Sequence, residues 1–396
     1  MAATTQAVPL TNRINRIEIS ATLAVVNEAD RLRQTGADLV DFGAGEPHFP
    51  TPQHIKDAAI EAIQKNFTKY TAVGGTADLR DAIVNRHKTD FGSDYKRDEA
   101  MAATGGKQAL FNAFQVLVDH GDEVIIPVPY WVSFKDIVRY AGGVPVFVNT
   151  DEQRGFVLTA DMVERAITPR TKVILLNSPS NPSGAVINPE ELTAIVRMAM
   201  RRNVWVVSDE CYVYLDFTGK NFSLGSLVGD KERLVIIGSL SKTYSMTGWR
   251  LGYALGPKSI IGAMSKLQSQ STSNPCSITQ KAAVAALTGP QECIKTMAAD
   301  YVRLRDRLVD GVREISGMQC NTPGGAFYVY PNVSAFIKNG TGTAAEIAGR
   351  LLREAGVVTV PGEAFGTEEH IRLSYATSMG EVERGLERMK KFFGGL

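Results

Sequence analysis

Residues 234–257 read LVIIGSLSKTYSMTGWRLGYALGP and place one lysine between two stretches that have the pattern of buried strands. The residues before it, from Leu234 to Gly238, are apolar or small, and GWRLGYALG (248–256) resumes the same pattern. A lysine normally keeps its charge in water on a solvated face. Lys242 therefore needs a buried partner or a covalent bond.

Short apolar runs of the same kind precede this segment. They are DEVIIPVP (122–129), VPVFV (144–148), KVILLN (172–177) and VWVVSDE (204–210). Their continuous hydrophobicity indicates strands that are covered on both faces. Helical patterns lie between them, one of them beginning at Asn188 as N-cap, with Pro189 in the first turn and Glu191 three residues after the cap. This alternation predicts an α/β fold, with a large domain over residues 49–289 in which helices flank a mostly parallel sheet.

A second, smaller α+β domain is predicted after the segment LTGPQE (287–292). A long charged helical pattern follows (293–315), and then come alternating pieces such as GGAFYVYPNV (324–333) and HIRLSYAT (370–377). We assign residues 16–48 and 290–396 to this domain, and residues 1–15 to an N-terminal arm.

Composition favours an enzyme that acts on small molecules. The 396 residues carry 43 Lys and Arg against 42 Asp and Glu, so no basic face for nucleic acid is implied. The cysteines are scattered without a CxxC pair, which argues against a zinc site and a disulfide framework; they are Cys211, Cys276, Cys293 and Cys320. With no signal peptide and no membrane-length apolar run, we expect a cytoplasmic protein without metal or membrane partners.

Polar residues and glycines gather where the predicted strands end. Gly105, Gly106 and Lys107 begin a helix, where backbone N–H groups attract an anion such as phosphate, although paired glycines also suit a simple turn. Asn177 and Asn181 follow a buried strand in NSPSNPSG, which also reads as a proline-rich turn. Ligands gather at the carboxyl ends of the strands in open α/β sheets.

Two further strand ends carry groups that suit one cofactor. Asp209 ends a buried strand, with Tyr212 three residues later, and Lys242 lies between Ser239 and Arg250. A nucleophilic lysine forms a Schiff base with an aldehyde, and the hydroxyl and guanidinium groups suit a phosphate on that aldehyde. Pyridoxal 5'-phosphate has both groups, and also a pyridine nitrogen whose proton a buried aspartate would hold.

The sequence resembles the fold type I pyridoxal-phosphate aminotransferases, specifically the bacterial aspartate aminotransferase branch of class I. The resemblance runs from FGAGEPHFPTP (42–52) to HIRLSYATS (370–378). Between them, in the order of the family, come KYTAVGG (69–75), TGGKQALFNAFQ (104–115), PYWVSF (129–134), NSPSNPSGAV (177–186), SDECY (208–212) and the opening segment.

The resemblance implies roles for individual residues in binding the cofactor. Lys242 matches the Schiff-base lysine and general base, and Asp209 matches the partner of the pyridine nitrogen. Asn181 and Tyr212 match the ligands of the ring oxygen, and Trp131 matches the aromatic ring stacked on the cofactor. The phosphate-binding groups and their helix start are matched by Gly105, Gly106, Lys107, Ser239 and Arg250. Tyr70 matches the tyrosine that reaches the phosphate of the neighbouring subunit, which implies a homodimer with shared active sites.

The resemblance also implies how substrate is held. Arg372 matches the arginine that clamps the α-carboxylate, and Gly45 a backbone contact to the same group. Lys107 is the candidate cation for a distal carboxylate, although a solvated helix-start lysine is the alternative. Residues 16–25 match a segment that closes over the substrate, with Ser20 and Thr22 as contacts; Trp131 and Asn181 complete the predicted substrate site.

The expected reaction is a ping-pong transamination of L-aspartate with 2-oxoglutarate, giving oxaloacetate and L-glutamate. Two enzymatic alternatives stay open: transamination of prephenate to arogenate, and a carbon–sulfur β-lyase on the same scaffold. Glu18, where many relatives carry a basic residue, would repel dianionic substrates at the entrance. A regulator that uses this fold as a ligand sensor would need a DNA-binding domain, for which the predicted domains leave no room.

Overall fold

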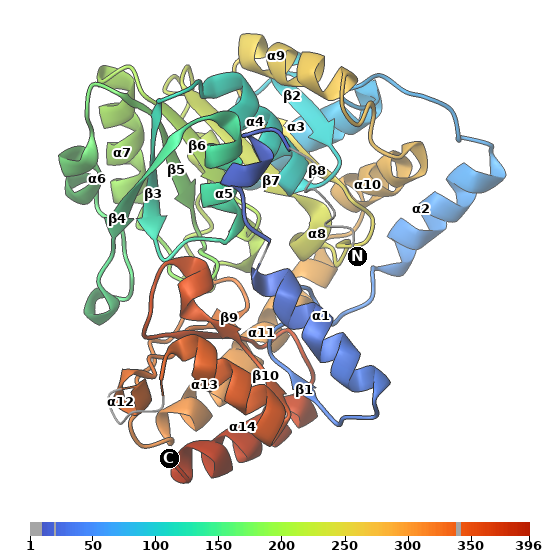
Figure 1. Ribbon diagram of the computed structural model, residues 1–396. Helices are drawn as coiled ribbons and strands as arrows, with labels where there is room; N and C mark the ends of the chain where they lie inside the picture. Colours follow the sequence, from blue (N-terminus) through green and yellow to red (C-terminus); the bar gives the residue numbers. More distant parts are fainter. Residues whose placement is uncertain (1–9, 20, 338–341) are drawn as a thin grey trace, which may run out of the picture.

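A seven-stranded sheet forms the centre of the computed structural model, which describes residues 10–19, 21–337 and 342–396 (Figure 1). In spatial order its strands are β2 (Ala100–Ala103), β8 (Gly252–Leu255), β7 (Leu234–Ser239), β6 (Trp205–Asp209), β5 (Thr171–Asn177), β3 (Glu123–Val128) and β4 (Val144–Asn149). The pairs from β7 to β4 are parallel, whereas β8 runs antiparallel to both β7 and β2. β2 therefore runs in the same direction as β7, β6, β5, β3 and β4, and the carboxyl ends of these six strands lie at one edge of the sheet.

Helices cover both faces of the inner strands, whose side chains point alternately to the two faces and are apolar on both. β4 lies at the edge of the sheet, and its Val144 and Phe147 are exposed, so the prediction that residues 144–148 are covered on both faces was wrong. In β5, Ile174 and Leu176 pack in a cluster with residues of α3, α7 and α10, whereas Val173 and Leu175 pack with residues of α4, α5 and α9. The helices are α2 (Gln53–Gln64), α3 (Ala77–Phe91), α4 (Gly106–Leu117), α5 (Ser133–Ala141), α6 (Ala160–Ala166), α7 (Pro189–Arg201), α8 (Leu240–Thr243), α9 (Lys258–Ser269) and α10 (Ser277–Thr288).

A separate hydrophobic cluster joins the two ends of the chain, in the lower part of Figure 1. Its strands are β1 (Val40–Asp41), which pairs in parallel with β10 (Val357–Val358), and an antiparallel sheet in the order β11 (Val360–Pro361), β12 (Ile371–Ser374) and β9 (Tyr328–Val329). The helices around them are α1 (Ala21–Gln34), α11 (Glu292–Arg313), α12 (Ser334–Phe336), α13 (Ala344–Arg350) with its π-helical continuation η7 (Leu351–Ala355), and α14 (Met379–Gly394). The mostly parallel sheet and the small antiparallel sheet confirm the predicted fold class.

Short 3-10 helices complete the described chain. They are η1 (Ile14–Arg16), η2 (Arg97–Glu99), η3 (Glu152–Arg154), η4 (Val213–Leu215), η5 (Leu224–Ser226) and η8 (Gly362–Phe365). None of the helices within residues 10–19, 21–337 and 342–396 is both long enough and apolar enough to cross a membrane.

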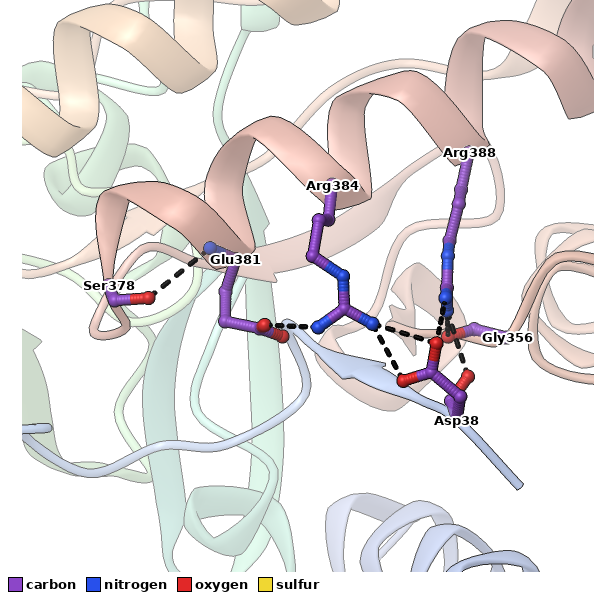
Figure 2. Close-up of polar contacts among 6 residues, drawn as sticks. All are labelled: Asp38, Gly356, Ser378, Glu381, Arg384 and Arg388. Atoms are coloured by element: carbon purple, nitrogen blue, oxygen red, sulfur yellow. Dashed lines mark hydrogen bonds and ion pairs between the residues drawn. The ribbon is translucent and has the colours of Figure 1, made fainter. Parts of the chain in front are cut away.

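Ion pairs fasten the turn before β1 to the last helix (Figure 2). Arg384 and Arg388 of α14 donate to the two carboxylate oxygens of Asp38, at 2.6 and 2.5 Å, and Arg388 also donates to the Asp38 carbonyl at 2.8 Å. Glu381 accepts from Arg384 at 2.5 Å, and its own N–H donates to Ser378 Oγ at the helix start. The network therefore links the segment that contains α1 and β1 to the C-terminal helix.

The predicted strand boundaries agree with β3 to β7 to within one residue at each end. One capping detail is different. Asn188 is the N-cap of α7, but its side chain accepts from Lys220 Nζ at 2.6 Å and makes no cap hydrogen bond. Glu191 accepts instead from the Ala160 N–H at 2.6 Å, so the start of α7 is fixed by neighbouring segments.

Candidate active site

A cavity of about 380 Å³ lies where β5, β6 and β7 end, and their last residues, Asn177, Asp209 and Ser239, line it. The same cavity brings together most of the residues predicted from the sequence. They are Gly45, Gly106, Lys107, Trp131, Asn181, Asp209, Tyr212, Ser239, Lys242, Arg250 and Arg372. Residues that are separated by more than 300 positions in the chain therefore face one space.

Lys242 is carried into the cavity by α8, the single turn that begins directly after β7. Ser239 caps this turn through its Oγ, which accepts from the Ser241 N–H at 3.1 Å. The Lys242 ammonium donates to the Gly45 carbonyl. Burial lowers the pKa of Lys242, and the charges of Arg372 and Arg250 act in the same direction. A neutral amine is therefore easier to form here than on the surface.

Asp209 is buried at the end of β6. Its Oδ1 accepts from the Cys211 N–H at 3.1 Å, and burial raises the pKa of its carboxyl to about 6. Among the residues that the structure describes, no cation forms an ion pair with Asp209. A buried carboxylate in this state is suited to a protonated nitrogen on a bound molecule.

An anion cradle lies between the start of α4 and Arg250. Gly105, the N-cap of α4, has φ +87°, and a Cβ there would lie 2.5 Å from Arg250 Nη2. Glycine therefore lets the guanidinium approach the helix start. A Cβ on Gly106 would meet the Cβ of Ser239 at 3.3 Å. The N–H groups of α4, a serine hydroxyl and a guanidinium together suit a phosphate.

Arg372 is 1 % exposed on β12 and makes no ion pair in the described part of the chain. Its Nη1 donates to Asn181 Oδ1 at 3.0 Å and its Nη2 to the Gly43 carbonyl at 2.8 Å. Its guanidinium carbon lies 4.4 Å from the centroid of the Tyr328 ring. Its Nε is buried without a hydrogen-bond partner among the described residues. A buried cation with a free donor is ready for an anionic ligand.

Asn181 and Tyr212 are fixed by groups that the sequence did not assign. The Asn181 N–H donates to Asn177 Oδ1 at 2.9 Å, and the Asn177 amide donates to the Asp209 carbonyl at 3.0 Å. The hydroxyl groups of Tyr212 and Tyr328 lie 2.8 Å apart, and burial raises the pKa of Tyr212 far above its usual value. Tyr212 therefore remains a neutral phenol that can donate a hydrogen bond.

Lys107 and Trp131 line the cavity and contact each other. The Lys107 ammonium is 4.7 Å from the centroid of the Trp131 ring, a distance typical of a cation–π contact. Burial lowers the pKa of Lys107, and the nearby Arg250 adds to the effect. Lys107 is nevertheless an exposed residue that also lines the cavity, so the alternative of a solvated helix-start lysine stays open.

Other predicted residues lie apart from the cavity or at its border. Tyr70 is 90 % exposed and does not line the cavity. Thr22 lies in α1, and Ser20 falls outside the described residues. The Glu18 carboxylate forms ion pairs, 2.6 Å from Lys135 Nζ and 3.8 Å from Arg139 Nη1. Its charge is therefore not free to repel substrates at the entrance of the site in the way that the sequence predicted. These contacts lower the pKa of Glu18.

The cavity also contains residues that sequence reasoning did not assign to the site. They are Val132, Cys211, Ser241, Thr247 and Tyr328, whereas Asn177 was singled out at its strand end without a role. Val132, Cys211 and Ser241 are direct sequence neighbours of predicted residues, so proximity in the motifs was an available signal for these three. Tyr328 had no such signal, because an aromatic residue in an alternating strand has the pattern of a core residue.

Comparison with known proteins assigns the chain to a family. The profile of the family "Aminotransferase class I and II" matches residues 37–389. An aspartate aminotransferase of Geobacillus stearothermophilus is 46% identical over 386 residues, which is 97% of this chain and 98% of that protein. An aspartate/prephenate aminotransferase of Cereibacter sphaeroides is 44% identical over 396 residues, covering 98% and 99%.

Solved structures agree with this assignment. The aspartate aminotransferase of Thermus thermophilus with maleate superposes with a TM-score of 0.93 at 42% identity, covering 97% of this chain and 99% of that one. An aspartate aminotransferase of Rhizobium meliloti gives a TM-score of 0.92 at 41% identity, covering 98% and 99%. The predicted resemblance is confirmed, and the chain belongs to the class I and II aminotransferases.

Proposed function

We propose that the protein transfers the amino group of L-aspartate to 2-oxoglutarate, giving oxaloacetate and L-glutamate. The observation that carries this proposal is that two cations, Arg372 and Lys107, line the same cavity as the amine of Lys242. Two separate cations suit the two carboxylates of aspartate, and a buried amine suits the chemistry between them. Relatives named aspartate aminotransferase at 42–46% identity support the same substrate.

The residues of the cavity fit pyridoxal 5'-phosphate, the cofactor of this family. When bound, this group supplies an aldehyde that bonds to amines and a ring that accepts electrons. Lys242 would hold the aldehyde carbon, and the cradle of Gly105, Gly106, Ser239 and Arg250 would hold the phosphate. The fit rests on the tight approach of Arg250 to Gly105 and on the unpaired, buried carboxyl of Asp209, which would hold the ring nitrogen.

The remaining cofactor contacts follow from the same cavity. The neutral Tyr212 hydroxyl and the Asn181 amide would donate to the ring oxygen, and Trp131 would cover one ring face. Lys107 borders the cradle as a further cation. Asn181 also accepts from Arg372, so one amide touches both the cofactor and the carboxylate sites.

Lys242 is the proposed proton carrier. Its lowered pKa favours the neutral amine, which, with the cofactor bound, would take the proton from the substrate α-carbon and pass it to the cofactor carbon within the same half-reaction. The two nearby arginines, Arg372 and Arg250, keep the amine from holding that proton too tightly. In the second half of the ping-pong cycle the same amine would carry a proton in the reverse direction, to the α-carbon derived from the 2-oxo acid.

Arg372 is the proposed ligand of the substrate α-carboxylate. Its free Nε and its burial support a strong, charge-assisted contact with a carboxylate, and the Gly45 backbone lies in the same cavity. Lys107 is the proposed ligand of the distal carboxylate. Closure of the segment around Thr22 over the substrate remains part of this proposal.

Prephenate is a second candidate amino-group acceptor. A relative named aspartate/prephenate aminotransferase is 44% identical. The expected repulsion by Glu18 is weakened because its charge is compensated by Lys135 and Arg139. A carbon–sulfur β-lyase would have no use for a cation that binds a distal carboxylate, the role proposed for Lys107, which lines this cavity.

We further propose a cytoplasmic homodimer in which Tyr70 reaches the phosphate of the neighbouring subunit. The 90 % exposure of Tyr70 supports a role outside its own subunit. The four free cysteines support a reducing compartment. We also propose the division into a large domain (49–289) and a small domain (16–48 and 290–396), supported by the separate hydrophobic clusters.

An absorption experiment tests the proposed function. The purified yellow protein is mixed with L-aspartate, then with 2-oxoglutarate, and the pair is repeated with prephenate as acceptor. Bleaching by aspartate and recovery with 2-oxoglutarate is the expected result, and recovery with prephenate would add the second activity. A yellow protein that aspartate leaves unchanged would contradict the aspartate assignment. Release of pyruvate and ammonia from cysteine would favour the lyase.

A further inference from the structure

Asp41, at the end of β1, bonds to the loop that follows it. Its Oδ1 accepts from the N–H groups of Gly43 at 2.8 Å and Ala44 at 3.1 Å. Its Oδ2 forms an ion pair with Arg33 of α1. Its side chain is 24% exposed, so it is not part of the hydrophobic cluster beneath β1.

The loop of residues 43–45 touches both functional cations. The Gly43 carbonyl accepts from Arg372 Nη2 at 2.8 Å, and the Gly45 carbonyl accepts from Lys242 Nζ. Asp41 therefore binds the N–H group of Gly43, the same residue whose carbonyl accepts the hydrogen bond from Arg372. A shift of the Gly43 peptide would move the guanidinium or break this hydrogen bond.

Asp41 is the contact that fixes this loop after the strand ends. The backbone of Phe42 is still hydrogen-bonded on both sides. Its N–H donates to the Val358 carbonyl at 3.0 Å, and its carbonyl accepts from the Ser374 N–H at 2.7 Å. In the described part of the chain, the N–H groups of Gly43 and Ala44 have no acceptor other than Asp41. The space is also tight, since a Cβ on Gly43 would lie 2.9 Å from Val358 Cγ1 and 3.3 Å from Asp41 Oδ1.

We propose that Asp41 is a positioning residue for the substrate carboxylate: by holding the Gly43 and Ala44 amides it fixes the Gly43 carbonyl and, through it, Arg372. The inference rests on the proposed function, because it assigns the carboxylate site to Arg372. It separates two roles of one carboxylate: Oδ1 sets the loop, whereas the ion pair of Oδ2 with Arg33 only joins α1 to β1.

The test uses variants that separate these roles in the holoenzyme. Asp41→Glu keeps the charge but moves the carboxylate away from the two amides, and Asp41→Ala removes it. Asp41→Asn keeps an oxygen acceptor for both N–H groups but loses the ion pair, as does Arg33→Gln. Asp30→Asn is the matched surface control, because Asp30 pairs with the same Arg33 at 2.7 Å.

For each variant we measure the maleate Kd by calorimetry, KM and kcat for aspartate, and the melting temperature. We expect Asp41→Glu and Asp41→Ala to raise the maleate Kd and the aspartate KM about tenfold, with kcat changed less than about threefold. Asp41→Asn, Arg33→Gln and Asp30→Asn stay within about twofold of the wild type. If Asp41→Ala does not fold, the comparison of maleate Kd between Asp41→Glu and Asp41→Asn still tests the proposal.

Three results would overturn the proposal. Wild-type values in Asp41→Glu, or a loss in Asp41→Asn equal to that in Asp41→Glu, would show that the amide contacts do not set the site. A lower melting temperature without any change in maleate Kd would assign Asp41 a purely structural role. If the wild-type holoenzyme itself neither binds maleate nor is bleached by aspartate, the proposed function fails, and this inference fails with it.

Discussion

The Lys107 ammonium lies 4.7 Å from the centroid of the Trp131 ring, in the cavity that also contains Lys242. The aromatic face attracts the ammonium without neutralising its charge, because the ring offers only a quadrupole. A carboxylate that enters the cavity therefore meets a cation that has no acidic partner among the described residues.

Replacing Lys107 by glutamine should weaken the binding of dicarboxylic substrates and leave that of monocarboxylic substrates nearly unchanged. A lost hydrogen bond to a charged group costs about 1.5–3 kcal/mol, so the KM for aspartate should rise about 10- to 100-fold. The KM for alanine, which has no distal carboxylate, should change little. Steady-state kinetics with both amino acids measures the difference, and Lys258→Gln, at an exposed lysine, is the control. An equal loss for both substrates would contradict the role of Lys107.

Replacing Lys242 by arginine should leave the fold intact and remove turnover. The guanidinium stays protonated, so it neither bonds to an aldehyde nor takes a proton from the substrate. We expect kcat to fall by at least about 10³-fold. Circular dichroism and the visible absorption spectrum check folding and the loss of the cofactor bond. Full activity in this variant would disprove the proposed mechanism.

Asp209 should make the stability of the cofactor-free protein depend on pH. Burial raises the pKa of its carboxyl from 3.8 to about 6, so folding takes up a proton between these values. The free energy of unfolding should therefore fall as the pH rises from about 4 to about 6, by about 3 kcal/mol from this group.

The difference between the wild type and Asp209→Asn isolates this contribution. The variant lacks the titration. The upward shift in the pKa of Glu210, to about 7, comes mainly from its own burial and is therefore present in both proteins, although the charge of Asp209 adds to it in the wild type. Melting temperatures measured from pH 4 to 7 should thus converge at the acid end and separate at the neutral end, with the variant more stable. Parallel curves would refute the prediction.

The Asp38 network should contribute a small, salt-sensitive stabilisation. Arg384 and Arg388 lower the pKa of Asp38 through their hydrogen bonds, so the contribution is present above the usual aspartate pKa and lost as the pH falls below it. Asp38→Ala should lower the melting temperature by no more than about 1–2 °C at low salt. The effect should shrink in 1 M NaCl, and a salt-independent loss would point to packing instead.

The residues at the strand ends could be predicted because sequence position and sheet geometry are directly related. The carboxyl ends of parallel strands meet at one edge, so Asn177, Asp209 and Ser239 had to lie close together once their strands were recognised. Lys242 followed from its position after a buried strand. Their arrangement around one cavity needed no information beyond the order of the elements.

Other features depended on contacts that a sequence pattern does not encode. β2 reads AMAA and lacks the β-branched residues typical of strands, so it becomes a strand because β8 pairs with it. The contact of Gly43 with Arg372 joins residues 329 positions apart. Tyr328, in an aromatic strand, has the same pattern whether it lines a cavity or fills a core.

The pairing of β1 with β10 has a consequence for synthesis of the chain. The hydrophobic cluster around β1 includes Val40, near the start, and Phe393 of α14, near the end. Until β10 and α14 have left the ribosome, β1 and Asp38 have neither the partner strand nor the arginines that hold them. The central sheet can assemble during translation, but this cluster closes only after the last helix has emerged.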